Sequence, residues 1–233
     1  MARDFMDLTL HFAPGACSRV SLIALEETQA AFDTKLVAFL AGEHTSPAYL
    51  ALNPAGKVPL LLVDGKPVAQ NVAILNFLAR AVPDARLMPF TGDPLEDAQL
   101  LSLLSWFASD LHPLVSRLRI PNFFCDVAGG PERVWQMAED RMKAQLLAVE
   151  VRLASSEWVL GDAWSAVDAY LYWVWFRITG AGFNSEAFPN ITEHFRRMEK
   201  RPSVRRALSR EARAQAELEA RGLAFQPPNP GIR

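Results

Sequence analysis

The sequence predicts a small α/β domain followed by a larger, all-helical domain. Through about the first eighty residues, short β-like runs and helical stretches follow one another in the order β-α-β-α-β-β-α. Beyond them we find long helical patterns and no convincing strand. The intervening segment "VPDARLMPFTGDP" contains three prolines and interrupts both periodicities. We therefore expect one domain over residues 1–83, a linker, and a second domain over residues 94–233.

The overall composition is that of an ordinary globular protein. The chain has 233 residues, 50% of them hydrophobic and 21% charged, with a net charge of −2. This charge gives no overall reason to expect nucleic acid or an anionic membrane as a partner. No apolar run approaches the ~20 residues that span a bilayer, and the two cysteines make no disulfide framework. The start of the chain carries acidic residues where a secretory signal is apolar, so we expect a cytoplasmic protein.

The α/β domain begins with "LTLHF" (8–12), whose alternation predicts a short strand that ends at Pro14-Gly15. From Ser18 onward, apolar residues recur with helical spacing. A second β-like run follows at 32–39. The Ser-Pro pair that opens residues 46–52 predicts a short helix with a serine cap.

The second half of this domain has a hairpin and a helix. Residues 60–63 form a strand, Asp64-Gly65 is a strong hairpin turn, and 67–69 make a brief return strand. "NVAILNFLARAV" (71–82) carries an apolar stripe with helical spacing, and Asn71 is its expected N-cap.

The all-helical domain contains one strong capping signal, "SAVD". In this capping box Ser165 accepts from the third backbone amide while Asp168 reaches back. The aromatic run 170–178 is expected to be core, with one or two of its rings lining a pocket. The expected helices cover residues 95–118, 132–154, 166–178, 191–200 and 204–220.

Cys17 lies after a turn and directly before the first helix. A free thiol has a pKa of ~8.5, and the unpaired amides of a helix N-terminus can lower it. The alternative is a small buried hydrophobe, the commoner role of a free cysteine. The chain has no CxxC motif, which disfavours a dithiol cycle. Ser18 either caps the helix or donates to a bound thiolate, and Arg19 is either solvated or a structural ion-pair partner.

Two further segments have a pattern suited to binding a peptide. In "NPAGKVP" (53–59), Val58-Pro59 is compatible with a cis peptide bond, although a trans bond is favoured statistically. A cis bond would leave the Val58 amide and carbonyl free to pair with an extended peptide. Gln70 and Asn71 precede a helix and offer amides to a carboxylate, or Asn71 simply caps that helix.

Other polar residues carry weaker signals. The four histidines (His11, His44, His112 and His194) show no metal-ligand spacing, so no metal site is expected. Arginines and glutamates alternate over residues 205–219, and this pattern is typical of a solvated helix face.

Taken in order, these motifs resemble those of the cytosolic glutathione transferases, most closely the bacterial beta-like group. The resemblance covers about Leu8 to Leu208. It rests on "APGACS", "NPAGKVP", the polar pair before "VAIL", "ASDLH", "SAVDAYL" and "RRMEKRPSVRRAL". It implies a thioredoxin-like first domain that holds most of the glutathione, a helical second domain, and a homodimer.

The resemblance also assigns site residues. Cys17, with Ser18 beside it, matches the cysteine that contacts the glutathione sulfur or forms a mixed disulfide with it. Val58 matches the residue whose backbone pairs with the cysteinyl part of glutathione. The other positions matched to glutathione binding, or lying in these motifs, are His44, Lys57, Pro59, Gln70, Asn71, Asp110 and His112. A small apolar electrophile would bind beside them, with Phe123, Phe124 and Trp175 as candidate lining residues.

The chain departs from the family pattern at several positions. The acidic-plus-small pair common in the beta group is Gln70-Asn71 here, Pro113 replaces a lysine after the "LH" histidine, and Thr45 replaces a lysine after "GEH". The end of the first strand (12–14) carries no hydroxyl, which leaves Cys17 and Ser18 as the groups that can touch the sulfur.

Three functions follow from this pattern. The first is glutathione transfer to an electrophile, with Cys17 and Ser18 stabilising the glutathione thiolate. The second is a glutathione-dependent disulfide reductase or peroxidase in which Cys17 is the nucleophile. The third is a non-catalytic binding protein that keeps the fold.

Overall fold

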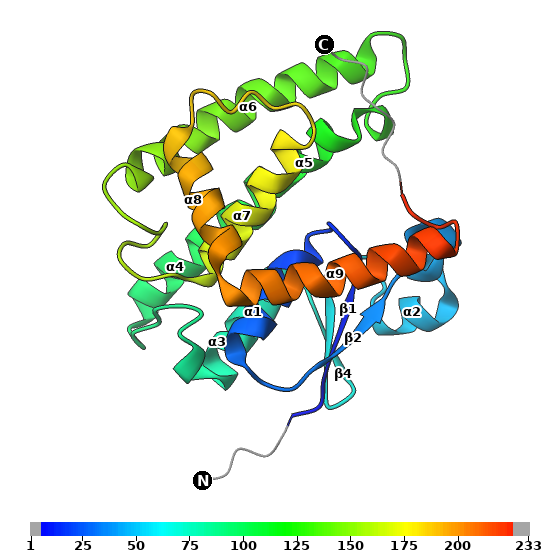
Figure 1. The fold of residues 1–233 in the computed structure, drawn as a ribbon, viewed down its shortest axis with the longest axis vertical. Coiled ribbons are helices and arrows are strands. Elements are labelled where there is room, and N and C mark those ends of the chain that lie inside the picture. Colours follow the sequence, from blue (N-terminus) through cyan, green and yellow to red (C-terminus); the bar gives the residue numbers. More distant parts are fainter. Residues whose placement is uncertain (1–5, 226–233) are drawn as a thin grey trace. The chain divides into compact units, whose positions relative to one another are not determined.

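The computed structural model describes residues 6–225, which form two compact units. The first contains the chain up to Leu87 together with Arg201–Phe225, and the second contains Met88–Lys200 (Figure 1). The sequence expectation placed everything after residue 93 in the second domain. The structure instead groups the last long helix with the first unit.

The first unit is built on a four-stranded mixed sheet of order β2-β1-β3-β4. β1 (Leu8–Phe12) pairs in parallel with β2 (Asp33–Leu36) and antiparallel with β3 (Leu60–Val63), and β3 pairs antiparallel with β4 (Lys66–Ala69). The predicted strand order along the chain is confirmed. The predicted hairpin turn is confirmed as well, because Asp64 and Gly65 both have positive φ.

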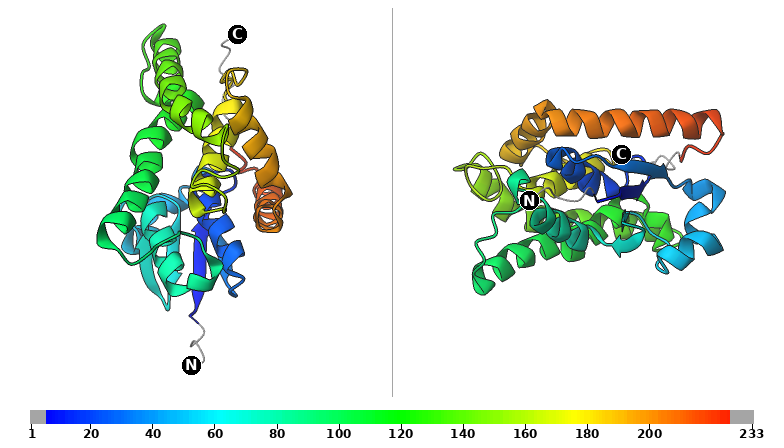
Figure 2. Two further views of the ribbon diagram at one scale, coloured as in Figure 1. Left: turned by 90° about the vertical axis from the view of Figure 1, so that its left-hand side faces the viewer. Right: turned by 90° about the horizontal axis from the view of Figure 1, so that it is seen from below.

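The helices of this unit are α1 (Ser18–Thr28), α2 (Pro47–Leu52), α3 (Asn71–Ala81) and α9 (Pro202–Ala220). α1 is buried over most of its surface, since it contacts β1, α3 and α9. α9 packs against α1, and the two lie next to each other in Figure 1 and in the right-hand view of Figure 2. The serine cap of α2 is confirmed: Ser46 Oγ accepts from the Tyr49 amide at 3.2 Å.

The N-termini of α1 and α3 differ from the sequence expectation. The N-cap position of α1 is Cys17 and that of α3 is Gln70, and neither side chain makes a capping hydrogen bond. Ser18 and Asn71 are therefore the first helical residues, and their side chains bond elsewhere, as described below.

The long elements of the second unit are all helices. They are α4 (Pro94–Trp106), a π-helical turn (Phe107–Leu111), α5 (His112–Arg119), α6 (Gly130–Leu153), α7 (Ala166–Thr179) and α8 (Pro189–Lys200). The single helix expected over 95–118 is thus interrupted by the π-helical turn. Among residues 6–225, no helix has the length and apolar character needed to cross a bilayer.

The core of the second unit surrounds α7, whose aromatic run is buried as expected. The predicted capping box is confirmed at its start. The fully buried Asp168 carboxylate accepts from the Ser165 amide at 2.8 Å and from the Val159 amide at 2.8 Å. Its Oδ1 also lies 2.9 Å from His194 Nε2. One carboxylate therefore joins the loop before α7, the start of α7, and α8.

Candidate active site

Cys17 lies at the N-terminus of α1 with its side chain partly exposed. Its Sγ donates to the Val58 carbonyl at 3.3 Å, which joins two segments 41 residues apart. The first turn of α1 contains no acidic residue that would offset the positive end of the helix. The helix end favours a negative charge on this sulfur, whereas the bond to the Val58 carbonyl belongs to the protonated thiol and is given up when the sulfur ionises.

Two side chains hold the backbone next to Val58 through hydrogen bonds to the Lys57 carbonyl. The Lys57 carbonyl accepts from the Tyr49 hydroxyl at 2.8 Å and from Asn53 Nδ2 at 2.7 Å. The Val58-Pro59 peptide bond is cis, as the resemblance implies. The Lys57 side chain is exposed, whereas Val58 and Pro59 are buried. Tyr49 and Asn53 thus fix the backbone next to Cys17. The sequence gives no sign of this role, because two side chains that share one carbonyl are recognised only in three dimensions.

Ser18 is fully buried, and its hydroxyl faces the protein backbone. Its Oγ donates to the Ala13 carbonyl and accepts from the Ala13 amide, both at 3.2 Å. The serine therefore closes the loop between β1 and α1. This geometry gives Ser18 a structural role in place of the capping or thiolate-donating role that its sequence position suggested.

Asn71 is also buried and bonds within the protein. Its Nδ2 donates to the Cys17 carbonyl at 3.0 Å, and its Oδ1 accepts from Ser21 Oγ at 2.6 Å. The side chain therefore ties the start of α3 to the start of α1. Ser21 is a residue of this network that the sequence did not reveal, since it occurs inside a helical pattern.

Gln70, next to Asn71, is exposed and has an unusual backbone conformation. Its φ is 74° and its ψ is 129°, a region that residues with a Cβ rarely occupy. Such strain often marks positions whose side chain or amide must face a ligand. The predicted pair Gln70-Asn71 is thus divided into one exposed residue and one buried residue.

His44 belongs to a short 3-10 turn, Glu43–Thr45, in the first unit. Its ring contacts Phe39 edge-on at 4.7 Å, and its Nδ1 is buried without a hydrogen-bond partner among the described residues. Beside it, the Glu43 carboxylate accepts from the Ala38 amide at 2.8 Å and pairs with Arg221 at 3.1 Å. Burial by itself would raise the pKa of Glu43, but these partners outweigh it and lower the pKa below its ordinary value.

Asp110 and His112 belong to the second unit, at the π-helical turn and the start of α5. The exposed Asp110 carboxylate accepts from Ser109 Oγ at 2.7 Å. His112 Nδ1 lies 3.2 Å from the Tyr170 hydroxyl, and its ring packs edge-on against Trp173 at 4.6 Å. π-Helical turns of this kind occur frequently at functional sites.

The candidate lining residues of the second-substrate pocket divide in two. Phe123 is 76% exposed and Phe124 is 46% exposed, with the Arg117 guanidinium 5.0 Å from the Phe124 ring centroid. Trp175 is only 2% exposed and packs against Phe183 and Phe188. Trp175 is therefore a core residue of the second unit, with almost no surface left for a substrate.

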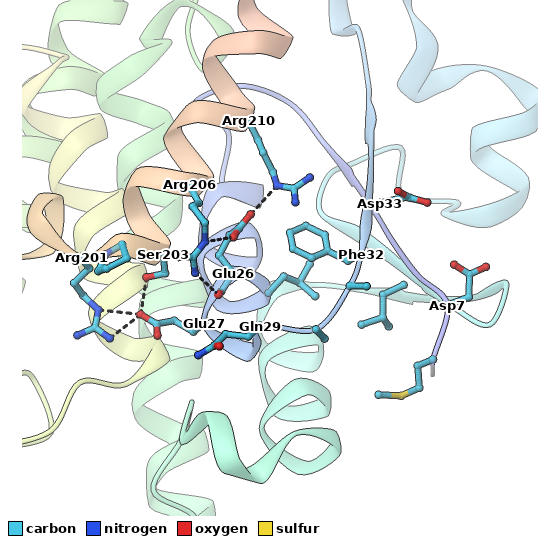
Figure 3. Close-up of a pocket in the computed structure, with 16 residues that line it drawn as sticks. Asp7, Glu26, Glu27, Gln29, Phe32, Asp33, Arg201, Ser203, Arg206 and Arg210 are labelled. Carbon is cyan, nitrogen blue, oxygen red and sulfur yellow. Dashed lines mark hydrogen bonds and ion pairs between the residues drawn. The ribbon is translucent and has the colours of Figure 1, made fainter. Parts of the chain in front are cut away.

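A hollow of about 790 Å³ lies elsewhere in the first unit (Figure 3). Its walls come from the end of α1, the segment before β2, and α9, and it contains none of the predicted site residues. Within residues 6–225, no group of three or more His, Cys, Asp or Glu side chains has an arrangement that could hold a metal ion.

Comparison with known proteins identifies the family. The model of the glutathione S-transferase N-terminal domain matches residues 6–80, and that of the C-terminal domain matches residues 111–202. Glutathione S-transferase GstA of Escherichia coli O157:H7 is 31% identical over 206 residues, which are 88% of this chain and 98% of that protein.

Solved structures agree with this match. A sphingomonad glutathione S-transferase complexed with glutathione is 32% identical with a TM-score of 0.76, covering 88% of this chain and 98% of that one. The bacterial beta-class enzyme of Sphingomonas chungbukensis is 35% identical with a TM-score of 0.75, covering 87% and 98%. This chain belongs to the glutathione S-transferase family.

Proposed function

We propose that this protein binds glutathione on its first unit and transfers it to a small apolar electrophile. The contact between Cys17 Sγ and the Val58 carbonyl at the N-terminus of α1 carries this proposal. This contact brings a thiol, a helix N-terminus and the backbone of Val58 together. The helix end suits the thiolate of a bound peptide, and the Val58 backbone suits the peptide's own backbone. The related sphingomonad structure with bound glutathione supports the same ligand.

In this proposal the glutathione backbone pairs with Val58 and its sulfur lies beside Cys17. Gln70 and the N-terminus of α3 bind the γ-glutamyl end, while His44 and Lys57 bind the glycine end. Pro59 fixes the course of the chain at Val58. Asn71 and Ser18 act by holding the backbone around Cys17, because both side chains are buried and bonded to it. Asp110 and His112, which belong to the second unit, are matched to glutathione binding by the family resemblance.

The chemical step forms a carbon–sulfur bond between the glutathione thiolate and the electrophile. The thiol loses its proton to solvent, and the leaving group departs with the electron pair of the bond that breaks. Lowering the thiol pKa by about two units corresponds to about 2.7 kcal/mol. A helix N-terminus supplies roughly 0.3–1 kcal/mol and one hydrogen bond to a charged sulfur roughly 1.5–3 kcal/mol, and the range of their sum includes this value.

A second function is favoured by the partial exposure of Cys17 at a helix N-terminus. Here the Cys17 thiolate attacks the disulfide of a glutathionyl conjugate, which forms a Cys17–glutathione disulfide and releases the substrate thiol. A free glutathione then attacks this disulfide, which releases oxidised glutathione and restores Cys17.

The variant Cys17→Ala separates the two functions. Conjugation of chlorodinitrobenzene is retained or increased if glutathione is the nucleophile, whereas disulfide reduction is abolished if Cys17 is. Cys125→Ala, which alters the other partly exposed cysteine, is the matched control and leaves both activities unchanged. A calorimetric titration of the wild type that shows no heat with glutathione would contradict both functions.

We propose further that the protein is a cytoplasmic homodimer, as the family resemblance implies. Sedimentation equilibrium measures the assembly state, and a monomer mass at micromolar concentration would overturn this part of the proposal. Cell fractionation tests the location.

A further inference from the structure

The helix that carries Cys17 is tied along its length to α9. At the end of α1, Glu26 accepts from Arg206 Nε and from Arg210 Nε, both at 2.6 Å. The adjacent Glu27 accepts from Arg201 at 2.7 and 2.9 Å and from Ser203 Oγ at 2.6 Å. Figure 3 shows these side chains reaching from α9 to the two glutamates.

At the start of α1 the connection is made by Arg19 and Glu211. Arg19 Nε and Nη2 both donate to Glu211 Oε2, at 3.0 and 2.5 Å. The two side chains are only 6% and 5% exposed. Glu211 Oε1 is buried without a hydrogen-bond partner among the described residues, so the carboxylate bonds Arg19 through one oxygen.

Both side chains of the Arg19–Glu211 pair are buried, which distinguishes it from the Arg221–Glu43 pair at the end of α9. The Arg221–Glu43 pair is 39% and 40% exposed, and pairs of that kind contribute little because water screens them. A buried charge that loses its partner is not screened by water, so it must move to the surface or draw water in. A change at Glu211 is therefore expected to displace Arg19.

Arg19 is two residues from Cys17, and the two side chains leave α1 on different sides. Cys17 Sγ points to Val58, whereas Arg19 points to α9. The Arg19 amide also donates to the Ala16 carbonyl at 3.0 Å, within the turn that leads into α1. A displaced Arg19 thus acts on Cys17 through the backbone of the first helical turn.

We propose that Glu211 is a positioning residue for Cys17, acting through Arg19. The proposal rests on the role that we propose for Cys17 in glutathione chemistry. The buried pair fixes the first turn of α1 from the α9 side, while Asn71 holds the Cys17 carbonyl from the α3 side. Together they keep the thiol at the end of the helix and against Val58.

The test measures the reactivity of the thiol itself. In a Cys125→Ser background Cys17 is the single cysteine, since the chain has two. The second-order rate of its alkylation by iodoacetamide at neutral pH is measured without glutathione. Glu211→Gln is expected to slow this rate about two- to fivefold, because the thiolate loses part of its stabilisation by the helix end. Glu211→Asp keeps the charge and is expected to lie between wild type and Glu211→Gln.

The matched control is Glu219→Gln, which changes an exposed glutamate on the same helix, bonded to Gln215. It leaves the alkylation rate unchanged. Should Glu211→Gln fail to fold, Glu211→Asp carries the test. The unpaired Arg19 cation of Glu211→Gln would by itself favour the thiolate, so a slower reaction requires that the thiol is displaced. The inference is overturned if the folded Glu211 variants react at the wild-type rate or faster, or if Glu219→Gln slows the reaction equally.

Two measurements distinguish the positioning role of Glu211 from the glutathione function. If wild type binds glutathione in a calorimetric titration while the Glu211 variants react normally, only the positioning role is lost. If the Glu211 variants react slowly but the wild type gives no heat with glutathione, the positioning of Cys17 stands and the glutathione function is lost.

Discussion

Asn71 donates to the carbonyl of Cys17 at 3.0 Å and so joins the first residues of α3 and α1. The two residues are 54 positions apart in the sequence. Since Ser21 donates to the other end of the same amide at 2.6 Å, the Asn71 side chain is bonded on both of its polar atoms.

Asn71→Ala should therefore lower both stability and activity. The change leaves the Cys17 carbonyl and the Ser21 hydroxyl without this partner in a buried place, at a cost of about 1–3 kcal/mol in unfolding free energy. Urea denaturation measures the loss, and glutathione-dependent activity should fall with it. The control is Asn76→Ala on the same helix, which removes an exposed hydrogen bond from Arg80 and should lower the unfolding free energy by less than about 0.5 kcal/mol. Equal losses in the two variants would contradict the assignment.

Gln70→Gly should change stability and binding in opposite directions. The φ of 74° strains a residue with a Cβ by about 1–3 kcal/mol, whereas glycine costs about 0.5–1 kcal/mol in backbone entropy. We expect the unfolding free energy to rise by about 1 kcal/mol while the glutathione affinity falls, since the side chain is lost. Gln70→Ala, which keeps the strain, should lose affinity without the gain. A glycine variant that is no more stable than the alanine variant would show that the position is unstrained.

His11 should make the first unit less stable in mild acid. Burial lowers the pKa of His11 below 6.5, and the charge of Lys35 lowers it further. The folded state then binds fewer protons than the unfolded state between that lowered pKa and 6.5, so stability decreases as the pH falls through this window. Thermal unfolding of wild type and His11→Leu from pH 7 to pH 5 measures the slope, which should be shallower in the variant. Parallel slopes would exclude His11 as the source.

Asp168→Asn should destabilise the second unit strongly. The buried carboxylate loses its charge while it still faces two backbone amides and His194, which it bonds at 2.8–2.9 Å. We expect a loss of about 3 kcal/mol or more, because breaking a buried network leaves its members unpaired. Asp162→Asn, an exposed change in the same loop, should be neutral within about 0.5 kcal/mol. A mild effect at Asp168 would mean that the amides find other acceptors.

Local signals were sufficient for much of the fold. The alternation at residues 8–12, the Asp64-Gly65 turn, the serine cap at Ser46 and the capping box at Ser165 each depend on neighbours within a few residues, and all are confirmed. The family match followed from the order of such signals along the chain.

Features that depend on distant partners were not visible in the sequence. The charges of residues 205–219 were expected to face solvent, but Glu211 is buried and Arg206 and Arg210 pair with Glu26. A helical charge pattern does not show which helix lies opposite. For the same reason Ser18 was expected to cap a helix or contact a thiolate, whereas its hydroxyl bonds back to Ala13.

Because residues 201–225 pack with the first unit, that unit is discontinuous in the chain. During synthesis on a ribosome, about half of the protein is made after residue 87 and before the helix that covers α1. Until then Arg19, Glu26 and Glu27 have no counter-charges from α9. A product truncated after residue 87 contains the four-stranded sheet but lacks α9, so expression of residues 1–87 by themselves should give an insoluble or unfolded fragment.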